Sequence, residues 1–362
     1  MHEALFQPIR YGAIEAPNRI VMAPLTRGRA DKAGVPSDLM IEYYRQRAGA
    51  GLIISEGTGI SVEGLGWPFA PGIWTDAQVE AWKPVTEAVH AAGGRIACQL
   101  WHMGRTVHPD FLNGAAPISA SATTAPDHAH TYEGRKPYGE ARAGTRDDIA
   151  RIIDDYGKAA HNARAAGFDA VQLHGANGYL IDQFLRAGTN LREDEYGGPA
   201  NNRVRFLREV LERLVDVLGS ERVGVRFSPN GATQGCDDPD PASVFGAAAK
   251  VCEDLDLAFV ELRQPGPDGT FGRSDVPRQH GTVRAAYSGP LILNSDYDAA
   301  TAAADIAAGI CDAVSFGRPY ISNPDLDRRI AAGAEFAPNK GVPQTWYTPG
   351  PVGYIDYPPM AG

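Results

Sequence analysis

The sequence predicts a single α/β domain, spanning residues 1–362, that is folded as a (β/α)8 barrel. Two observations favour this fold: short apolar runs recur eight times, and a helical pattern follows nearly every run. The runs alternate poorly between apolar and polar residues, which is typical of strands buried on both faces of a parallel sheet. Division by an average domain size would suggest two domains, but one large barrel commonly uses this length.

The elements follow one another in a regular order. The predicted strands occupy residues 20–23, 51–55, 95–100, 170–174, 223–227, 257–262, 290–294 and 312–316. The predicted helices occupy residues 38–48, 76–92, 146–166, 202–218, 241–254, 279–286, 298–308 and 324–332. The pattern at 279–286 is the weakest of these.

Three segments lie outside the repeating units. Pro8, Gly12 and Pro17 precede the first strand and predict a small hairpin that closes the bottom of the barrel. Residues 104–145 form a long insertion after strand three, and their prolines and glycines predict irregular chain over the barrel mouth. The tail after residue 334 is rich in proline and aromatic residues, so we expect an ordered, extended segment.

The composition excludes several classes of protein. The chain is 43% hydrophobic and 22% charged, as in ordinary globular proteins, and its net charge of -10 argues against a nucleic-acid partner. No apolar run approaches the ~18 residues that span a membrane, and the first residues lack a signal pattern. The cysteines form no C-x-x-C pair, so we expect reduced thiols and a cytoplasmic protein. They are Cys98, Cys236, Cys252 and Cys311.

In a parallel barrel, function gathers at the carboxyl ends of the strands. No lysine for a Schiff base stands at these ends, and no cluster of acids or histidines predicts a metal site. The residues present suit a planar heteroaromatic ring that carries a phosphate, with the phosphate at strands seven and eight beside Arg318. The candidate residues, in chain order, are Pro24, Thr26, Gly57, Gln99, Trp101, His174, Asn177, Tyr179, Arg226, Ser295, Asp296, Gly317 and Arg318.

The segment from His174 to Tyr179 carries the strongest functional signal. It directly follows the apolar run of strand four and contains an imidazole, a carboxamide and a phenol within six residues. His174 and Asn177 can both donate to one substrate oxygen, and Tyr179 can supply a proton. The alternative interpretation is a loop whose His and Asn cap the following helix.

Several motifs together resemble the Old Yellow Enzyme family of FMN-dependent ene-reductases. The resemblance extends over nearly the whole chain and implies a barrel that binds FMN and uses NADPH or NADH. The motifs that carry it occupy residues 16–27, 42–48, 51–56, 99–102, 174–179, 194–198, 316–319 and 323–326.

The resemblance also implies residue roles. Pro24, Thr26, Gly57 and Gln99 would hold the isoalloxazine ring, with the Thr26 hydroxyl near flavin O4. Arg226 would contact the N1–O2 edge of the flavin. Ser295, Asp296 and Gly317 would bind the phosphate through their backbone, together with Arg318, and we expect the Asp296 carboxylate to point away from the phosphate. The expected pocket walls are Trp67, Trp101, Gln234 and Tyr347.

The implied activity is the reduction of activated C=C bonds in enones, maleimides and nitroalkenes, and of nitrate esters. Hydride would pass from flavin N5 to the substrate, His174 and Asn177 would bind its oxygen, Tyr179 would protonate it, and Thr26 would tune the flavin. The partners are small molecules and a nicotinamide cofactor, for a monomer or a homodimer. The alternatives are a flavin-binding barrel that senses a ligand without turnover and a metal-dependent barrel hydrolase.

Overall fold

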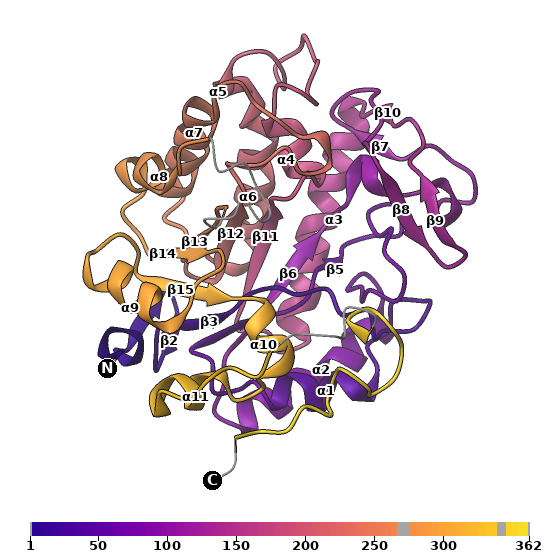
Figure 1. Cartoon of the computed structure of the whole chain (residues 1–362). Coiled ribbons are helices and arrows are strands. Elements are labelled where there is room, and N and C mark those ends of the chain that lie inside the picture. The colour runs from indigo at the N-terminus through magenta and orange to yellow at the C-terminus, as the bar shows by residue number, and fades with distance from the viewer. Residues whose placement is uncertain (1, 266–275, 339–344, 361–362) are drawn as a thin grey trace.

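The computed structural model describes residues 2–265, 276–338 and 345–360, and in these ranges eight parallel strands form a barrel (Figure 1). The strands are β3 (Ile20–Met22), β4 (Leu52–Ile54), β6 (Ile96–Trp101), β11 (Ala170–Gly175), β12 (Val223–Phe227), β13 (Phe259–Arg263), β14 (Leu291–Asn294) and β15 (Ala313–Phe316). Consecutive strands pair, and β6 pairs with β11 to close the sheet. The predicted fold and its eight strands are confirmed.

Helices connect the strands and cover the outside of the barrel. They are α1 (Asp38–Arg45), α2 (Asp76–Ala91), α3 (Arg146–Ala165), α4 (Leu180–Leu185), α5 (Ala200–Arg203), α6 (Arg205–Leu218), α7 (Pro241–Asp254), α8 (His280–Ala286), α9 (Ala299–Ala307), α10 (Arg318–Ser322) and α11 (Leu326–Ala332). Capping boxes at Thr75, Thr145 and Asp298 explain the sharp starts of α2, α3 and α9.

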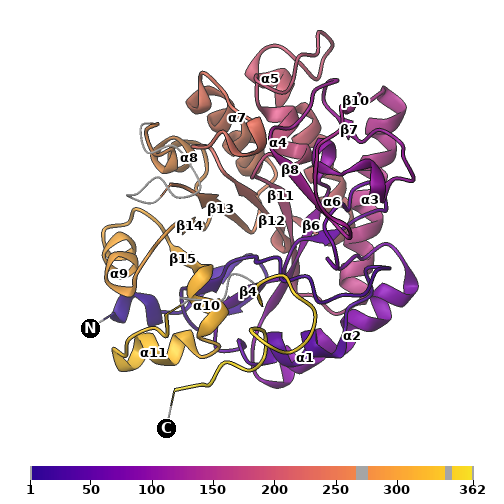
Figure 2. The ribbon, with the colours of Figure 1, turned by 45° about the vertical axis from the view of Figure 1, so that its right-hand side comes forward.

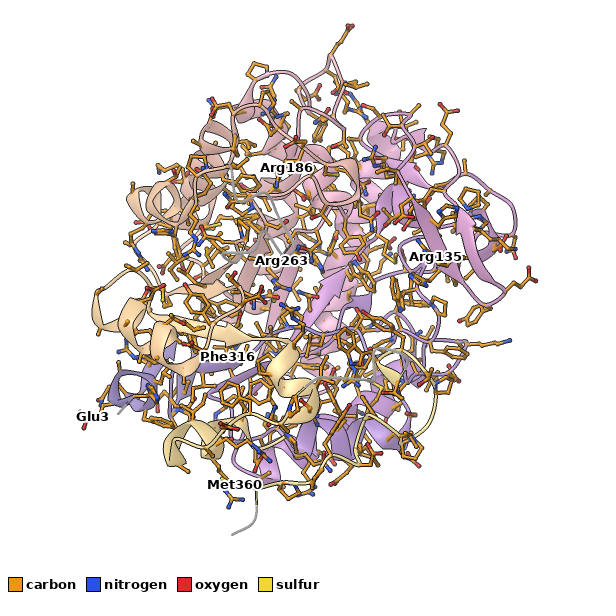
Figure 3. All side chains as sticks on the ribbon, in the orientation of Figure 1. Glu3, Arg135, Arg186, Arg263, Phe316 and Met360 are labelled. Atoms are coloured by element: carbon orange, nitrogen blue, oxygen red, sulfur yellow. The ribbon has the colours of Figure 1, made fainter. Side chains whose placement is uncertain are left out.

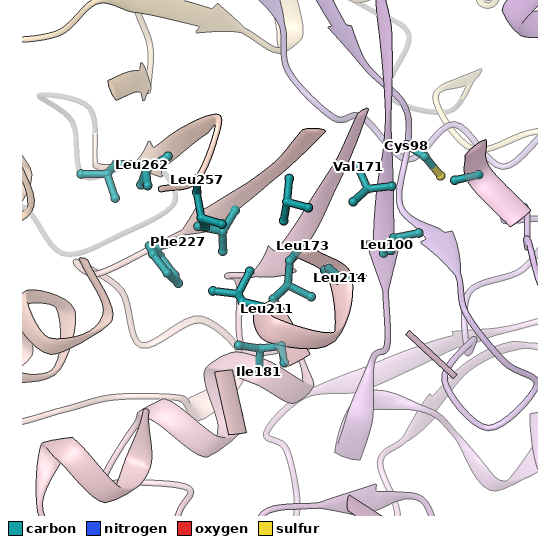
Figure 4. Close-up of a cluster of buried hydrophobic side chains, with 14 of the residues drawn as sticks. Cys98, Leu100, Val171, Leu173, Ile181, Leu211, Leu214, Phe227, Leu257 and Leu262 are labelled. Carbon is teal, nitrogen blue, oxygen red and sulfur yellow. The ribbon is translucent and has the colours of Figure 1, made fainter. Parts of the chain in front are cut away.

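Some helix boundaries differ from the predictions. The predicted helix 202–218 is divided at Val204, where ψ of −5° departs from the helical value, so α5 and α6 are separate. The short helices α4 and α10 were not predicted. Figure 4 shows why the long helices bury one face: Leu211 and Leu214 of α6 lie beside Leu173 of β11, and all three are inaccessible to solvent.

The N-terminal hairpin closes the bottom of the barrel, as predicted. Its strands are β1 (Ile9–Tyr11) and β2 (Ile14–Ala16), and the short helix η1 (Glu3–Phe6) precedes them. Ala13 N–H donates to the Glu221 carbonyl at 2.8 Å, just before β12 begins. Gly12 has φ of +55°, and a Cβ there would lie 2.2 Å from the Glu221 oxygen, so the turn requires glycine.

The insertion at 104–145 is more regular than the sequence predicted. It contains the short helices η2 (Gly104–Thr106) and η3 (Pro109–Phe111) and the parallel pair β7 (Ile118–Ser119) and β10 (Arg142–Ala143) (Figure 2). It also contains a hairpin of β8 (His128–Thr131) and β9 (Gly134–Pro137) (Figure 1). Thr131 Oγ1 accepts from Glu133 N–H and donates to the Gly134 carbonyl, which closes the hairpin turn. Expecting irregular chain throughout was therefore wrong.

The remaining short elements are β5 (Thr58–Gly59), which pairs with the end of β6, η4 (Ser220–Arg222) and η5 (Thr233–Gly235). The described tail, residues 345–360, is anchored by buried arginines: Arg27 donates to the Gly353 carbonyl at 2.6 Å and Arg29 to that of Thr345 at 2.7 Å. Across the described residues, no helix has both the length and the apolar character needed to cross a membrane.

Candidate active site

A polar network crosses the interior of the barrel near the carboxyl ends of its strands. Glu261 of β13 is fully buried, and its carboxylate accepts from Gln172 Nε2 at 2.8 Å and from Ser315 Oγ at 2.5 Å. Gln172 in turn accepts from Gln99 Nε2 at 2.8 Å. Because a carboxylate can only accept, it orients both amides, and Gln99 is left with its oxygen as an acceptor for a further group.

Arg226 of β12 joins the same network. Its Nε lies 3.3 Å from Glu261 Oε2, and its Nη2 donates to Asn294 Oδ1 at 2.7 Å. Asn294 donates onward to the Ser315 carbonyl at 2.9 Å. Burial lowers the pKa of Arg226, while the Glu261 carboxylate opposes that shift. A buried cation is therefore held in one orientation between the Glu261 carboxylate and the Asn294 amide.

His174, near the end of β11, and Tyr179, in the loop that follows, lie against each other. The rings of His174 and Tyr179 meet edge to face, with 4.9 Å between their centroids. The centroid of the Trp101 ring lies 6.2 Å from that of His174 and 5.0 Å from that of Tyr179. Burial, with the charges of Arg226 and Arg263, lowers the pKa of His174 well below its usual value, so the imidazole is neutral at pH 7. Its Nδ1 accepts from Ala176 N–H at 3.3 Å, which leaves Nε2–H as a donor.

The capping interpretation of this loop is wrong. The first turn of α4 has no side-chain cap from its N-cap residue, Tyr179. Gly178 N–H, just before the helix, instead donates to Oδ2 of Asp182 in the first turn of α4, at 2.9 Å. Asn177 has φ of +61°, its N–H donates to Ser228 Oγ at 2.7 Å, and its side-chain Oδ1 accepts from Arg263 Nη1. The side chains of His174 and Asn177 are thus available for a ligand rather than used by the helix.

The ends of strands one and two form a second wall. Glu56 is buried and accepts from the N–H groups of Arg27 and Gly28 at 3.0 Å and 3.1 Å, which fixes the segment that carries Pro24 and Thr26. A Cβ on Gly57 would lie 2.6 Å from the Trp101 ring. Glycine is therefore required here by the tryptophan, whatever else approaches it.

The residues predicted to bind a phosphate lie together after β14 and β15. Among the described residues, Ser295 Oγ is buried without a hydrogen-bond partner. Gly317 leads directly into α10, which begins at Arg318. The Asp296 carboxylate forms an ion pair with Arg318. That this carboxylate points away from a bound phosphate stays a prediction.

The predicted pocket walls fall into two groups. Trp67 and Tyr179 pack against the apolar cluster that contains Trp101, and Trp67 also contacts Tyr347 at 5.3 Å and His130 of the β8–β9 hairpin at 4.8 Å. Gln234 lies against Gly178, where an added Cβ would come within 2.6 Å of its own Cβ. Aromatic rings from four separate segments therefore converge near the loop after β11.

Sequence reasoning missed three polar residues of this site: Gln172, Glu261 and Arg263. A signal for two of them was present, because Glu261 and Arg263 are charged residues within or beside the apolar run 257–262. Gln172 precedes His174 by two residues and therefore lies on the same face of its strand. In the described part of the chain, no three His, Cys, Asp or Glu side chains are grouped so that they could hold a metal ion.

Comparisons with known proteins agree with this geometry. A family model described as the NADH:flavin oxidoreductase / NADH oxidase family matches residues 4–336. An Old Yellow Enzyme homologue from Zymomonas mobilis, of known structure, is 56% identical with a TM-score of 0.95, over 98% of this chain and 99% of that chain. Morphinone reductase, solved in complex with tetrahydroNAD, is 42% identical with a TM-score of 0.92, over 99% and 98% of the two chains.

Similarity to proteins of known activity extends to plants. The 12-oxophytodienoate reductase 7 of Oryza sativa subsp. japonica is 40% identical over 375 residues, which cover 98% of this chain and 94% of the rice protein. Since the family model and these relatives span nearly the whole chain, the protein belongs to the Old Yellow Enzyme family and is an FMN-dependent NAD(P)H oxidoreductase.

Proposed function

We propose that this protein reduces C=C bonds activated by a carbonyl or nitro group, in enones, maleimides and nitroalkenes, with NADPH or NADH as the reductant. Nitrate esters are a second substrate class for the same site. The observation that carries this proposal is the meeting of a neutral, oriented imidazole with a phenol, 4.9 Å apart between ring centroids, beside a carboxamide. The imidazole and the carboxamide can donate hydrogen bonds to the activating oxygen of the substrate, and the phenol can supply a proton to its carbon.

His174 and Asn177 bind the activating oxygen of the substrate. Negative charge develops on this oxygen during reduction, and fixed donors in a buried site stabilise it. A neutral imidazole suits the role because its Nε2–H remains a donor at all pH values above the lowered pKa. Trp67, Trp101, Gln234 and Tyr347 form the walls that hold the alkene in place.

Tyr179 donates a proton to the α-carbon of the alkene. Burial raises the pKa of its hydroxyl, so the phenol is protonated throughout the neutral range. The acid is therefore ready in the form that the reaction consumes. Nitrate esters do not require protonation of a carbon, so their reduction does not depend on this hydroxyl.

The chain's residues fit FMN, which supplies hydride chemistry between the nicotinamide and the substrate. The acceptor oxygen of Gln99 suits the imide N–H of the flavin, and Arg226 suits its N1–O2 edge, where reduction places negative charge. Pro24, Thr26 and Gly57 would border the ring, with the Thr26 hydroxyl near O4. The partnerless hydroxyl of Ser295 supports a phosphate site formed with Asp296 N–H, Gly317 N–H and Arg318.

The test is anaerobic mixing of the purified, FMN-containing protein first with NADPH or NADH and then with 2-cyclohexenone. We expect bleaching of the flavin absorbance by the nicotinamide and its return on addition of the enone, with saturated ketone as the product. In a sensor that binds ligands without turnover, the nicotinamide would bleach the flavin absorbance, but the absorbance would return no faster with the enone than without it. A colourless protein that still hydrolyses esters would support the metal-dependent hydrolase.

A further inference from the structure

Asn177 presents an ambiguity that its own backbone does not resolve. A carboxamide carries an acceptor oxygen and a donor nitrogen of nearly equal size, and rotation of its terminal torsion exchanges them at low cost. The hydrogen bond from Asn177 N–H to Ser228 Oγ fixes the backbone but not this rotation. In one orientation the amide donates to a substrate oxygen, and in the other it repels that oxygen.

We propose that Arg263 is a positioning residue that fixes the Asn177 amide with its N–H2 toward the substrate. This inference rests on the proposed function and adds a residue to it. Arg263 Nη1 donates to Asn177 Oδ1. A guanidinium has five N–H donors and no acceptor, so it can pair only with the amide oxygen. The nitrogen of Asn177 is thereby directed to the opposite side.

The barrel holds Arg263 firmly enough for this role. It is the last residue of β13, two positions after Glu261, so both side chains lie on the same face of that strand. In the parallel pairing of β13 with β14, its backbone lies opposite Asn294. Figure 3 shows it near the middle of the barrel. Burial, followed by repulsion from Arg226, lowers the pKa of Arg263 to about 9, which still leaves it charged at pH 7. A charged donor also polarises the amide and strengthens its N–H2 as a donor.

His174 is oriented by the same principle. Ala176 N–H occupies its acceptor nitrogen, just as Arg263 occupies the acceptor oxygen of Asn177. Both acceptors of the oxygen-binding pair are thus occupied by the protein. The substrate oxygen consequently meets two donors and no competing lone pair.

The test is a double-mutant cycle of Arg263→Met and Asn177→Ala, read by equilibrium titration of the FMN-containing protein with 4-hydroxybenzaldehyde. The oxygen of this phenol, as a phenolate, needs the same donors as a substrate oxygen. Arg263→Met should weaken binding about tenfold in the wild-type background, the weight of one hydrogen bond to a charged group. In the Asn177→Ala background the same change should have little further effect, because there is no amide left to orient.

Two other results separate the explanations. Arg263→Lys, which keeps a charged donor, should bind the phenol more tightly than Arg263→Met. If Arg263→Met weakens binding equally in both backgrounds, Arg263 acts by charge alone and the positioning proposal is wrong. If the double-mutant cycle gives the expected result but the wild-type protein does not reduce enones, the proposed function fails while the positioning role stands. FMN content and the far-UV spectrum of each variant show whether it folds.

Discussion

At the scale of single residues, Tyr179 is the most direct test of the proposed chemistry. Tyr179→Phe should slow enone reduction by ~10²–10⁴-fold, the usual loss on removing a general acid. Reduction of the bound FMN by NAD(P)H needs no proton from this hydroxyl and should keep its rate. Stopped-flow measurement of the two half-reactions separates them.

The matched control is Tyr156→Phe, because Tyr156 of α3 is a fully buried phenol that lies outside the site, and its hydroxyl has no hydrogen-bond partner among the described residues. It should leave both half-reactions unchanged. Equal slowing of both steps in Tyr179→Phe would indicate a structural or nicotinamide-binding role. Unchanged enone reduction would mean that another group or water delivers the proton.

Contacts between residues that are far apart in the chain could not be predicted from the sequence. His174, Asn177 and Tyr179 are six residues or fewer apart, so their proximity could be predicted from one segment. Glu261 contacts Arg226 of β12, and Arg263 contacts Asn177 in the loop after β11. Such pairs depend on the register of the closed sheet. The ion pair between Asp296 and Arg318 was not predicted for a related reason: it joins the ends of two different strands, and no spacing in the sequence indicates that these side chains meet.

At the scale of elements, the ends of β14 and β15 predict opposite effects of two substitutions. Arg318→Ala should weaken FMN binding, so that flavin is lost on dialysis, because the phosphate loses its cation. Asp296→Asn should strengthen it, because the carboxylate that pairs with Arg318 competes with the phosphate and repels it. Dissociation constants from fluorescence titration of the apoprotein with FMN measure both.

These two variants control one another, since they remove either half of the same ion pair. If the pair only stabilised the fold, both substitutions would weaken FMN binding in parallel. Flavin retention by Arg318→Ala equal to that of the wild type would contradict the phosphate assignment.

The strands and helices that could be predicted are those whose burial leaves a clear apolar pattern in the sequence. The barrel strands are buried on both faces, so each appears in the sequence as an apolar run, and all eight were found. The β8–β9 hairpin lies outside the barrel and buries only alternate residues, Ala129 and Thr131. With two small side chains facing inward, it carries too little apolar pattern to be distinguished from loop.

At the scale of the whole molecule, the barrel separates stability from chemistry. Its lower end is filled by apolar side chains of the N-terminal hairpin and of the barrel strands, including Ile14, Leu52 and Ile292. Its upper end buries charged and polar groups, which is costly unless they are paired. Histidines at that end are buried in neutral form, so the fold as a whole becomes sensitive to acid.

His102 makes this sensitivity measurable. It is inaccessible to solvent, its Nδ1 accepts from Gly104 N–H at 3.1 Å, and burial, followed by the charge of Arg151, lowers its pKa to about 3. The unfolded chain binds a proton at His102 below a pH of about 6.5. The native state binds it only near pH 3, so the free energy of unfolding falls as the pH drops from 6.5 toward 3. At pH 5 the loss from this one group is about 2 kcal/mol.

His102→Gln should therefore reduce the difference in unfolding free energy between pH 7 and pH 5, by about 2 kcal/mol relative to the wild type. Urea titrations of the FMN-containing protein at the two pH values give this difference, and any pH-independent destabilisation by the substitution cancels from it. His161→Gln, on the exposed face of α3, is the matched control and should leave the difference unchanged. If both variants keep the wild-type difference, His102 titrates in the native state near its ordinary pKa, and acid sensitivity must come from other buried groups such as His174.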